Sequence, residues 1–428
     1  MSKTIPYNVG KWLPTDQKIF NQWLGKVLKE AESEENQYLL PPVQALKHLI
    51  ESDRYIYNIT QLMFAEIPVN DVDTPTGTPQ VRTYQQMLLM LNRIIQRAPE
   101  FNKTGLVGTP INAIFDYPMA TKAGYVFFNN PKVNACLKNI LDYWGKFLQT
   151  ADTKYVLNTS ETGWLSDYAL KEMSKVAYGD DFFNIFNCPN HDKTKHLGFT
   201  SWDKFFTRTF NPGIRPVQNA DDADSIANAC ESAPFRIAHN LPLKAKFWIK
   251  GQPYSLVDLL DGDPWASKFE GGTLYQAFLS ALSYHRWNSP VSGKIVKAYN
   301  LPGTYYAESL YQGFENPRGA DPAAANDSQA FLTSTATRAV IFIQADNPKI
   351  GLMAFVAVGM SEVSSDEITV RVGQHVNKGD QLGMFHFGGS THVLLFRPET
   401  KLEFNLHGQK PSIAGNNIKV KAEIARVE

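Results

Sequence analysis

The residues with the most distinctive chemistry lie near the end of the chain, in the segment Gly383-Met-Phe-His-Phe-Gly-Gly-Ser-Thr-His392. Two glycines directly before Ser390 favour a strained turn, in which the serine hydroxyl can reach the carbonyl carbon of Gly389. Attack there shifts the acyl group from nitrogen to oxygen. Elimination from the resulting ester breaks the chain and leaves a dehydroalanine, which hydrolyses to a pyruvoyl group. The segment therefore predicts a zymogen that cuts itself between Gly389 and Ser390 and makes its own ketone cofactor.

A ketone of this kind condenses with a substrate amine to a Schiff base. It then accepts the electrons of the breaking bond between Cα and the carboxylate, which is the chemistry of an amino-acid decarboxylase. Gly-Gly-Ser-Thr alone is a weak signal, because glycine turns before strands are common. Further motifs accompany it in a defined order: Trp202-Asp-Lys-Phe-Phe-Thr-Arg-Thr-Phe210, Gly213-Ile-Arg-Pro-Val217, Asn228-Ala-Cys-Glu-Ser-Ala-Pro234 and Ser283-Tyr-His-Arg-Trp-Asn-Ser-Pro-Val-Ser-Gly293.

In order and spacing, these motifs resemble the pyruvoyl-dependent phosphatidylserine decarboxylase family. Joined to a helical N-terminal half, they are most similar to a soluble branch of that family, which includes fungal L-tryptophan decarboxylases. The resemblance implies a carboxy-lyase that converts L-tryptophan or another aromatic L-amino acid into the amine and CO2. Two alternatives stay open: a phosphatidylserine decarboxylase that makes phosphatidylethanolamine, and a non-maturing pseudo-enzyme with a binding role.

The resemblance also implies roles for individual residues. The family's cleavage pair falls on Gly389 and Ser390, and its decarboxylation-pocket histidine falls on His285, a candidate proton donor to the carbanion. The aspartate of the self-cleavage triad falls on Glu231, and the triad histidine falls on Asn288. Glutamate can replace a carboxylate that orients an imidazole. Asparagine cannot replace a base, because its amide takes up no proton near neutral pH.

Self-cleavage therefore needs another base, is slow, or does not take place. His386 lies four residues before Ser390, and His392 lies two residues after it. Residues two apart in a strand share a face, so His392 is expected to flank Ser390 on its own side. Both histidines are candidate catalytic residues for maturation, and the alternative for each is an ordinary polar residue of a β domain.

Two halves of different character must position these residues. Residues 1–200 predict a helical N-terminal domain, and residues 201–428 predict a mainly antiparallel β-sandwich domain with the decarboxylase chemistry, so the fold class is α+β. A polar stretch over residues 309–330 is expected to form a long loop. Apolar periodicity predicts helices over residues 15–28 (capped by Thr15), 41–50, 82–97, 133–148 and 164–176, and strands over 245–249, 293–298, 338–345, 352–358, 367–372 and 392–397.

Composition limits the function further. The 428 residues include 42 Lys and Arg and 42 Asp and Glu, which argues against a general nucleic-acid binder. Three scattered cysteines favour a reducing compartment and no disulfide framework. The N-terminus lacks the apolar core of a signal peptide, and no apolar run reaches the length of a membrane span. We expect a cytoplasmic homo-oligomer of cleaved two-chain units that takes a small amino-acid substrate, with no metal and no membrane partner.

Overall fold

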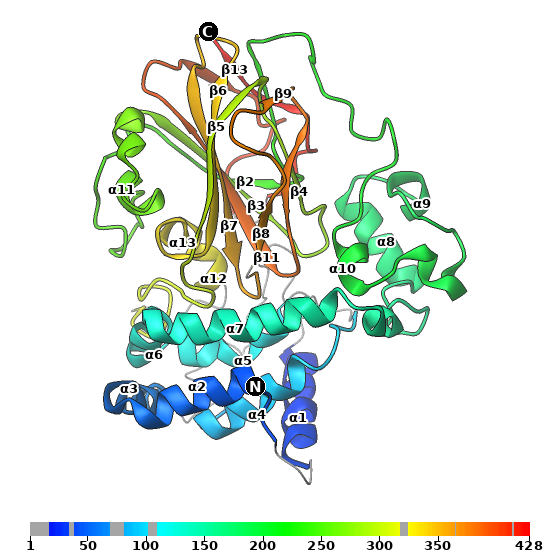
Figure 1. The fold of residues 1–428 in the computed structure, drawn as a ribbon, viewed down its shortest axis with the longest axis vertical. Helices are drawn as coiled ribbons and strands as arrows, with labels where there is room; N and C mark the ends of the chain where they lie inside the picture. The colour runs from blue at the N-terminus through cyan, green and yellow to red at the C-terminus, as the bar shows by residue number, and fades with distance from the viewer. Residues whose placement is uncertain are drawn as a thin grey trace.

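The computed structural model describes residues 17–33, 38–68, 81–101, 109–316, 324–363, 365–412 and 415–428. Helices occupy the first half of the chain and strands the second, which confirms the α+β class. In Figure 1 the helices α1 to α7 lie below the strands, and α8 to α10 lie beside them.

Helices such as α2, α3 and α7 bury one apolar stripe each, whereas nearly all side chains of α5 are buried. In α2, for example, Val43, Leu46 and Ile50 are buried, and the helix begins at Pro41, whose fixed φ suits a first helical position. The bounds are α1 Gln17–Ser33, α2 Pro41–Ser52, α3 Arg54–Ala65, α4 Tyr84–Ile94, α5 Pro110–Met119, α6 Lys122–Phe128, α7 Pro131–Leu148, η3 Ala151–Val156, α8 Asp167–Val176, α9 Phe182–Ile185, η4 Lys193–Gly198 and α10 Trp202–Phe206.

The strands form one large and two small sheets, and neighbouring strands are antiparallel. The seven-stranded sheet has the order β2-β3-β11-β7-β6-β5-β9, and the three-stranded sheets have the orders β1-β13-β12 and β4-β10-β8. The bounds are β1 Ser225–Ala227, β2 Ala233–Ala238, β3 Thr273–Leu279, β4 Arg286–Asn288, β5 Gly293–Leu301, β6 Arg338–Ala345, β7 Leu352–Met360, β8 Asp366–Ile368, β9 His375–Val376, β10 Gln381–Phe385, β11 Gly389–Phe396, β12 Leu402–Phe404 and β13 Glu423–Val427. Short helices α11 Leu256–Leu259, η5 Pro264–Phe269, α12 Ala324–Asp327 and α13 Gln329–Thr335 complete the domain.

Each face of the seven-stranded sheet has its own core. Leu394 and Phe396 of β11 pack with residues of the two small sheets, whereas Val393 and Leu395 pack on the opposite face near α11 and α13. Because side chains alternate along a strand, even-numbered residues of β11 face the small sheets. A third core fills the helical half and includes Phe387, so the turn before β11 is packed against the helices.

The structure corrects several details of the sequence prediction. Residues 245–249 form no strand: Phe247 packs on Phe331, whereas Trp248 and Ile249 are exposed. The strand expected over residues 367–372 is limited to β8. The polar stretch 309–330 contains α12 and the start of α13. Thr15 lies outside the described residues, so its expected capping role is not tested. Helices α3, α5 and α6 were not expected.

Candidate active site around Gly389 and Ser390

Ser390 lies at the start of β11, in the interior of the seven-stranded sheet. It is the register partner of Leu279 in β3 and of Gly359 in β7. Its side chain is fully buried, and its Oγ has no hydrogen-bond partner among the described residues. A buried hydroxyl without a partner costs free energy, so the position is unusual for a merely structural serine.

The turn before Ser390 requires glycine. Gly388 has a φ of +140°, and a Cβ there would lie 2.5 Å from the Ser361 carbonyl oxygen and 2.7 Å from the Val363 nitrogen. The N–H of Gly389 donates to the same Ser361 carbonyl at 3.1 Å. The loop after β7 therefore holds the bond that is expected to break.

His285 is tied to this end of the sheet from two sides. Its carbonyl accepts from the N–H of Phe385 at 2.9 Å, and its ring stacks on Phe206 with centroids 4.0 Å apart. Within the described part of the chain, neither ring nitrogen has a hydrogen-bond partner. Burial and the neighbouring Arg208 lower the pKa of His285 to about 3, although the carbonyl of Ser280 opposes this. Ser280 directly follows the register partner of Ser390.

His392 shares the face of β11 that carries Ser390. It is fully buried beside the rings of Tyr275 and Phe355, with centroids 6.1 and 5.9 Å away. Both ring nitrogens lack a partner among the residues that the structure describes. Burial lowers the pKa of His392 to about 3, so the imidazole is neutral at pH 7 and has a lone pair available.

Both ring nitrogens of His386 contact carboxylates and not Ser390. Its Nδ1 lies 2.7 Å from a carboxylate oxygen of Asp203, and its Nε2 lies 2.9 Å from one of Glu367. Burial opposes the charged form, but the two carboxylates prevail and raise the pKa of His386. An imidazole that donates from both nitrogens has no lone pair with which to accept a proton.

Glu231 is bound by an arginine. The guanidinium of Arg215 donates to both of its carboxylate oxygens, and the N–H of Val420 donates to one of them at 2.8 Å. Burial raises the pKa of Glu231, and these donors oppose the rise. Asn288 donates to the carbonyl of Gly379 at 2.9 Å, and its Oδ1 has no partner within the described residues. The two positions expected to hold triad residues therefore contact other groups.

The structure thus brings Ser390, His285 and His392 to the start of β11, and gives Glu231 and His386 separate ionic partners. Sequence reasoning missed Glu362, which lies in the loop after β7. No local motif marks it, because its partners come from α5, about 250 residues earlier in the chain.

A pocket of about 380 Å³ opens beside the turn before Ser390. Trp144 of α7 and Phe387 form part of its apolar wall, with ring centroids 5.3 Å apart. Glu362 and His386 also line it. A second hollow of about 490 Å³ lies next to it, and Lys138, Ser365 and His386 line both. The volume suits a small-molecule ligand.

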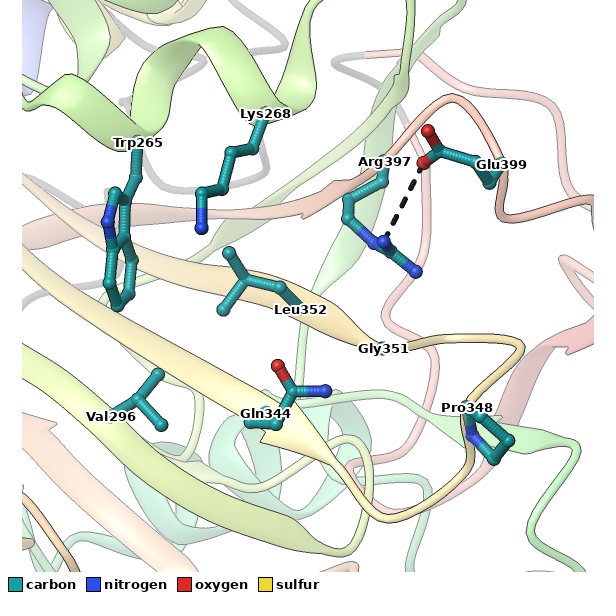
Figure 2. Close-up of a pocket in the computed structure, with 9 residues that line it drawn as sticks. All are labelled: Trp265, Lys268, Val296, Gln344, Pro348, Gly351, Leu352, Arg397 and Glu399. Carbon is teal, nitrogen blue, oxygen red and sulfur yellow. Dashed lines mark ion pairs between the residues drawn. The ribbon is translucent and has the colours of Figure 1, made fainter.

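Figure 2 shows a different pocket, of about 720 Å³, between Trp265, Lys268 and the Arg397–Glu399 ion pair. Arg397 follows the last residue of β11, whereas Ser390 is near its beginning. At about 3.3 Å per strand residue, the two lie about 23 Å apart along β11. This pocket is therefore separate from the candidate active site.

The described residues contain no group of three or more His, Cys, Asp or Glu side chains arranged to hold a metal ion. Nor does any helix in these ranges combine the length and the apolar character that a bilayer span demands.

Comparison with known proteins identifies the family. Two family profiles, both described as phosphatidylserine decarboxylase, match residues 40–173 and 202–420. "Decarboxylase iboD" of Amanita muscaria is 42% identical over 79% of this chain and 99% of its own length. An L-tryptophan decarboxylase of Psilocybe cubensis is 36% identical over 92% of this chain and 90% of its own. A phosphatidylserine decarboxylase proenzyme of Oryza sativa is 30% identical over 56% of this chain and 37% of its own.

The similarity to the two fungal decarboxylases spans both halves of the chain, whereas the similarity to the rice proenzyme covers little more than half of it. The chain therefore belongs to the phosphatidylserine decarboxylase family, in its L-tryptophan decarboxylase-like branch, and is a carboxy-lyase.

Proposed function

We propose that this protein is a pyruvoyl-dependent decarboxylase of aromatic L-amino acids, with L-tryptophan as the first candidate, and that it matures by cutting itself between Gly389 and Ser390. The observation that carries the proposal is the buried, unpartnered hydroxyl of Ser390 directly after a turn that only glycine fits. The names of the fungal relatives support the substrate class.

The proposed maturation has three chemical steps: an acyl shift, an elimination and a hydrolysis. The Ser390 Oγ attacks the Gly389 carbonyl carbon, and the peptide nitrogen leaves with a proton, so the peptide becomes an ester. Loss of the Ser390 α-proton then expels the Gly389 carboxylate and leaves a dehydroalanine at residue 390. Water replaces its amine, ammonia departs, and a ketone remains at the new N-terminus.

The residues around Ser390 fit such a ketone. Residue 390 would become the first residue of β11, and strands β3 and β7 hold β11 on both sides. When present, the pyruvoyl group supplies an electron sink for the loss of CO2. The ring of Phe206 supports the His285 imidazole, and His285 is proposed to hold a proton for the reacting carbon. Phe387 and Trp202 help to exclude water from this end of the sheet.

Base assistance for the first step is proposed to come from His392, because both nitrogens of His386 are engaged by carboxylates. A second candidate is a protein that does not mature. Two observations favour it: Arg215 occupies the carboxylate of Glu231, and Asn288 stands where the family has a histidine. The same experiment distinguishes the two.

The test uses purified wild-type protein, Ser390→Ala and Ser267→Ala, an exposed serine on η5 that serves as the matched control. Wild-type protein and the control should give fragments 1–389 and 390–428 on a denaturing gel, with a blocked ketone on the small fragment by mass spectrometry. They should form tryptamine from L-tryptophan, and little phosphatidylethanolamine from phosphatidylserine vesicles. Ser390→Ala should stay uncut and inactive. A single uncut wild-type band, or cut Ser390→Ala protein, would refute the proposed maturation.

A further inference from the structure

Glu362 is a buried carboxylate with one free oxygen. Its side chain is 4% exposed. Its Oε1 accepts from the backbone N–H groups of Ile111 at 2.6 Å and Asn112 at 3.0 Å, at the start of α5. Its Oε2 has no hydrogen-bond partner anywhere in the described ranges. A buried acceptor left unpaired is costly, so the free oxygen needs an explanation.

The backbone holds Glu362 in place. Ser361 and Glu362 have positive φ values of +31° and +63°, which are uncommon for residues with a side chain. The hydroxyl of Ser361 donates to Asn112 at 2.9 Å, which ties the loop to α5 on a second side. A strained backbone that is over-determined by its contacts is a feature of functional sites.

Glu362 lines the 380 Å³ pocket beside the Ser390 turn. The walls of this pocket are aromatic and aliphatic where Trp144, Phe387 and Leu141 line it. Two other acidic residues in the pocket have cationic partners, because Asp142 pairs with Lys138 and Asp203 pairs with His386. Glu362 therefore offers a hydrogen-bond acceptor that its own surroundings leave available.

The pocket also adjoins the reacting end of β11. The carbonyl of Ser361 holds the N–H of Gly389, and Glu362 is the next residue along the loop. Phe387 lies three residues before Ser390. A substrate joined to residue 390 through its amine would find its side chain next to an apolar pocket with one buried acceptor.

We propose that Glu362 determines substrate class: its free Oε2 accepts a hydrogen bond from the ring N–H of an indole that packs against Trp144 and Phe387. This inference rests on the proposed function, since it assigns the side-chain end of the same substrate. A phenyl ring would leave the acceptor unpaired, and a side chain with a carboxylate would be repelled. Sites built around a buried polar group reject analogues that lack the matching group.

The acceptor role requires the ionised form of Glu362. Burial raises the pKa of Glu362 to about 8, and the N–H groups of Asn112 and Ile111 oppose the rise. A third N–H donor at Oε2 would stabilise the carboxylate further. Binding should therefore be measured at pH 9, where the carboxyl group is mostly ionised before the ligand arrives.

The experiment measures calorimetric binding of indole and 1-methylindole to full-length protein. Neither probe has an amine or a carboxylate, so neither can be turned over. The variants are Glu362→Gln and Glu399→Gln; Glu399 lies in the Figure 2 pocket, and its side chain is 68% exposed. In Glu362→Gln the amide oxygen keeps the two N–H groups of α5, so the amide NH2 must face the pocket as a donor.

Wild-type protein should bind indole about tenfold or more tightly than 1-methylindole. Glu362→Gln should weaken indole to the level of 1-methylindole while its melting temperature shows that it is folded, and Glu399→Gln should behave as wild type. Equal binding of the two probes to wild-type protein overturns the inference without reliance on any variant. Discrimination that survives in Glu362→Gln also overturns it, because the methyl group would then act only by its size.

The same preparations are assayed with L-tryptophan. Indole discrimination without tryptamine formation would leave the pocket assignment standing and contradict the proposed reaction. Tryptamine formation without indole discrimination would do the reverse.

Discussion

The N–H of Gly389 donates to the carbonyl of Ser361 at 3.1 Å, so the loop that carries Glu362 is hydrogen-bonded to the residue before Ser390. The proposed substrate contact at Glu362 and the proposed cut after Gly389 therefore lie on opposite sides of one hydrogen bond. The crowding at this contact gives the first prediction.

Gly388→Ala should slow or prevent the cut at residue 389 and destabilise the fold by about 1–3 kcal/mol. Its Cβ would meet backbone atoms of Ser361 and Val363, which cannot move aside as a flexible side chain can. Gly373→Ala is the matched control, since its φ is also positive, at +89°, but nothing lies within 4 Å of the added Cβ. Precursor loss on a gel and thermal melts measure both effects. Identical behaviour of the two variants would contradict the crowding argument.

His285→Ala should still cut itself but lose turnover by about 10²–10⁴-fold, the usual contribution of a general acid or base. Because burial and Arg208 lower the pKa of His285 to about 3, the ring is neutral at pH 7 and donates through one N–H only. His285→Gln keeps an N–H hydrogen-bond donor but cannot deliver a proton, so it should be about as inactive as His285→Ala. Steady-state rates are compared only for fully cut protein. Unchanged turnover in cut His285→Ala would exclude the assigned role.

His392→Ala should slow precursor cleavage by about tenfold or more, because the variant loses the neutral imidazole on the Ser390 face. His386→Ala should have little effect, as both nitrogens of His386 are engaged by carboxylates. Asn288→His should also have little effect, since Arg215 already occupies the Glu231 carboxylate. A time course on denaturing gels ranks the three. Acceleration by Asn288→His would show instead that the family's original triad geometry survives.

Indole affinity should depend on pH through Glu362. The pKa of the free carboxyl is about 8, and the ligand N–H lowers it, so affinity is greatest above pH 8. Below that pH it should fall by up to about tenfold per pH unit, until the pKa of the bound state is reached. Calorimetric titrations between pH 6 and 9 measure this, and Glu362→Gln should give a flat profile.

That variant retains the other titratable groups near the pocket, so their contributions cancel in the comparison: Lys138, Asp142 and Lys146 of α7, Asp203 of α10, Tyr306, Glu367 and His386. A parallel pH profile in Glu362→Gln would assign the effect to one of these groups.

Apolar periodicity and proline positions in the sequence predicted those helices and strands whose bounds depend on neighbouring residues. The apolar run of β6 was predicted with its observed bounds, and the proline pair at Pro41 marked the start of α2. Helix α5 was missed because nearly all of its side chains are buried, which removes the amphipathic period. Residues 245–249 misled because an apolar run need not form a buried strand: Phe247 packs on Phe331, and Trp248 and Ile249 are exposed.

The residues of the candidate site also fall into two groups: those that a sequence motif marks and those that only the tertiary fold reveals. Ser390 and His285 could be found because they sit in short motifs. The partner of His386 could not, because Asp203 lies 183 residues away and only the tertiary fold brings them together. Glu362 gave no signal at all, since an acceptor becomes notable only when its burial and its unused oxygen are known.

The position of β11 has a consequence for the life of the protein after the proposed cut. The segment from Ser390 onward supplies an interior strand of the seven-stranded sheet, and its β13 pairs with β1 of the larger fragment. Nicking the backbone at that point would release no flexible tail. The short fragment would be kinetically trapped inside its partner and could not exchange between molecules without global unfolding, so each ketone would stay for life in the pocket of the chain that made it.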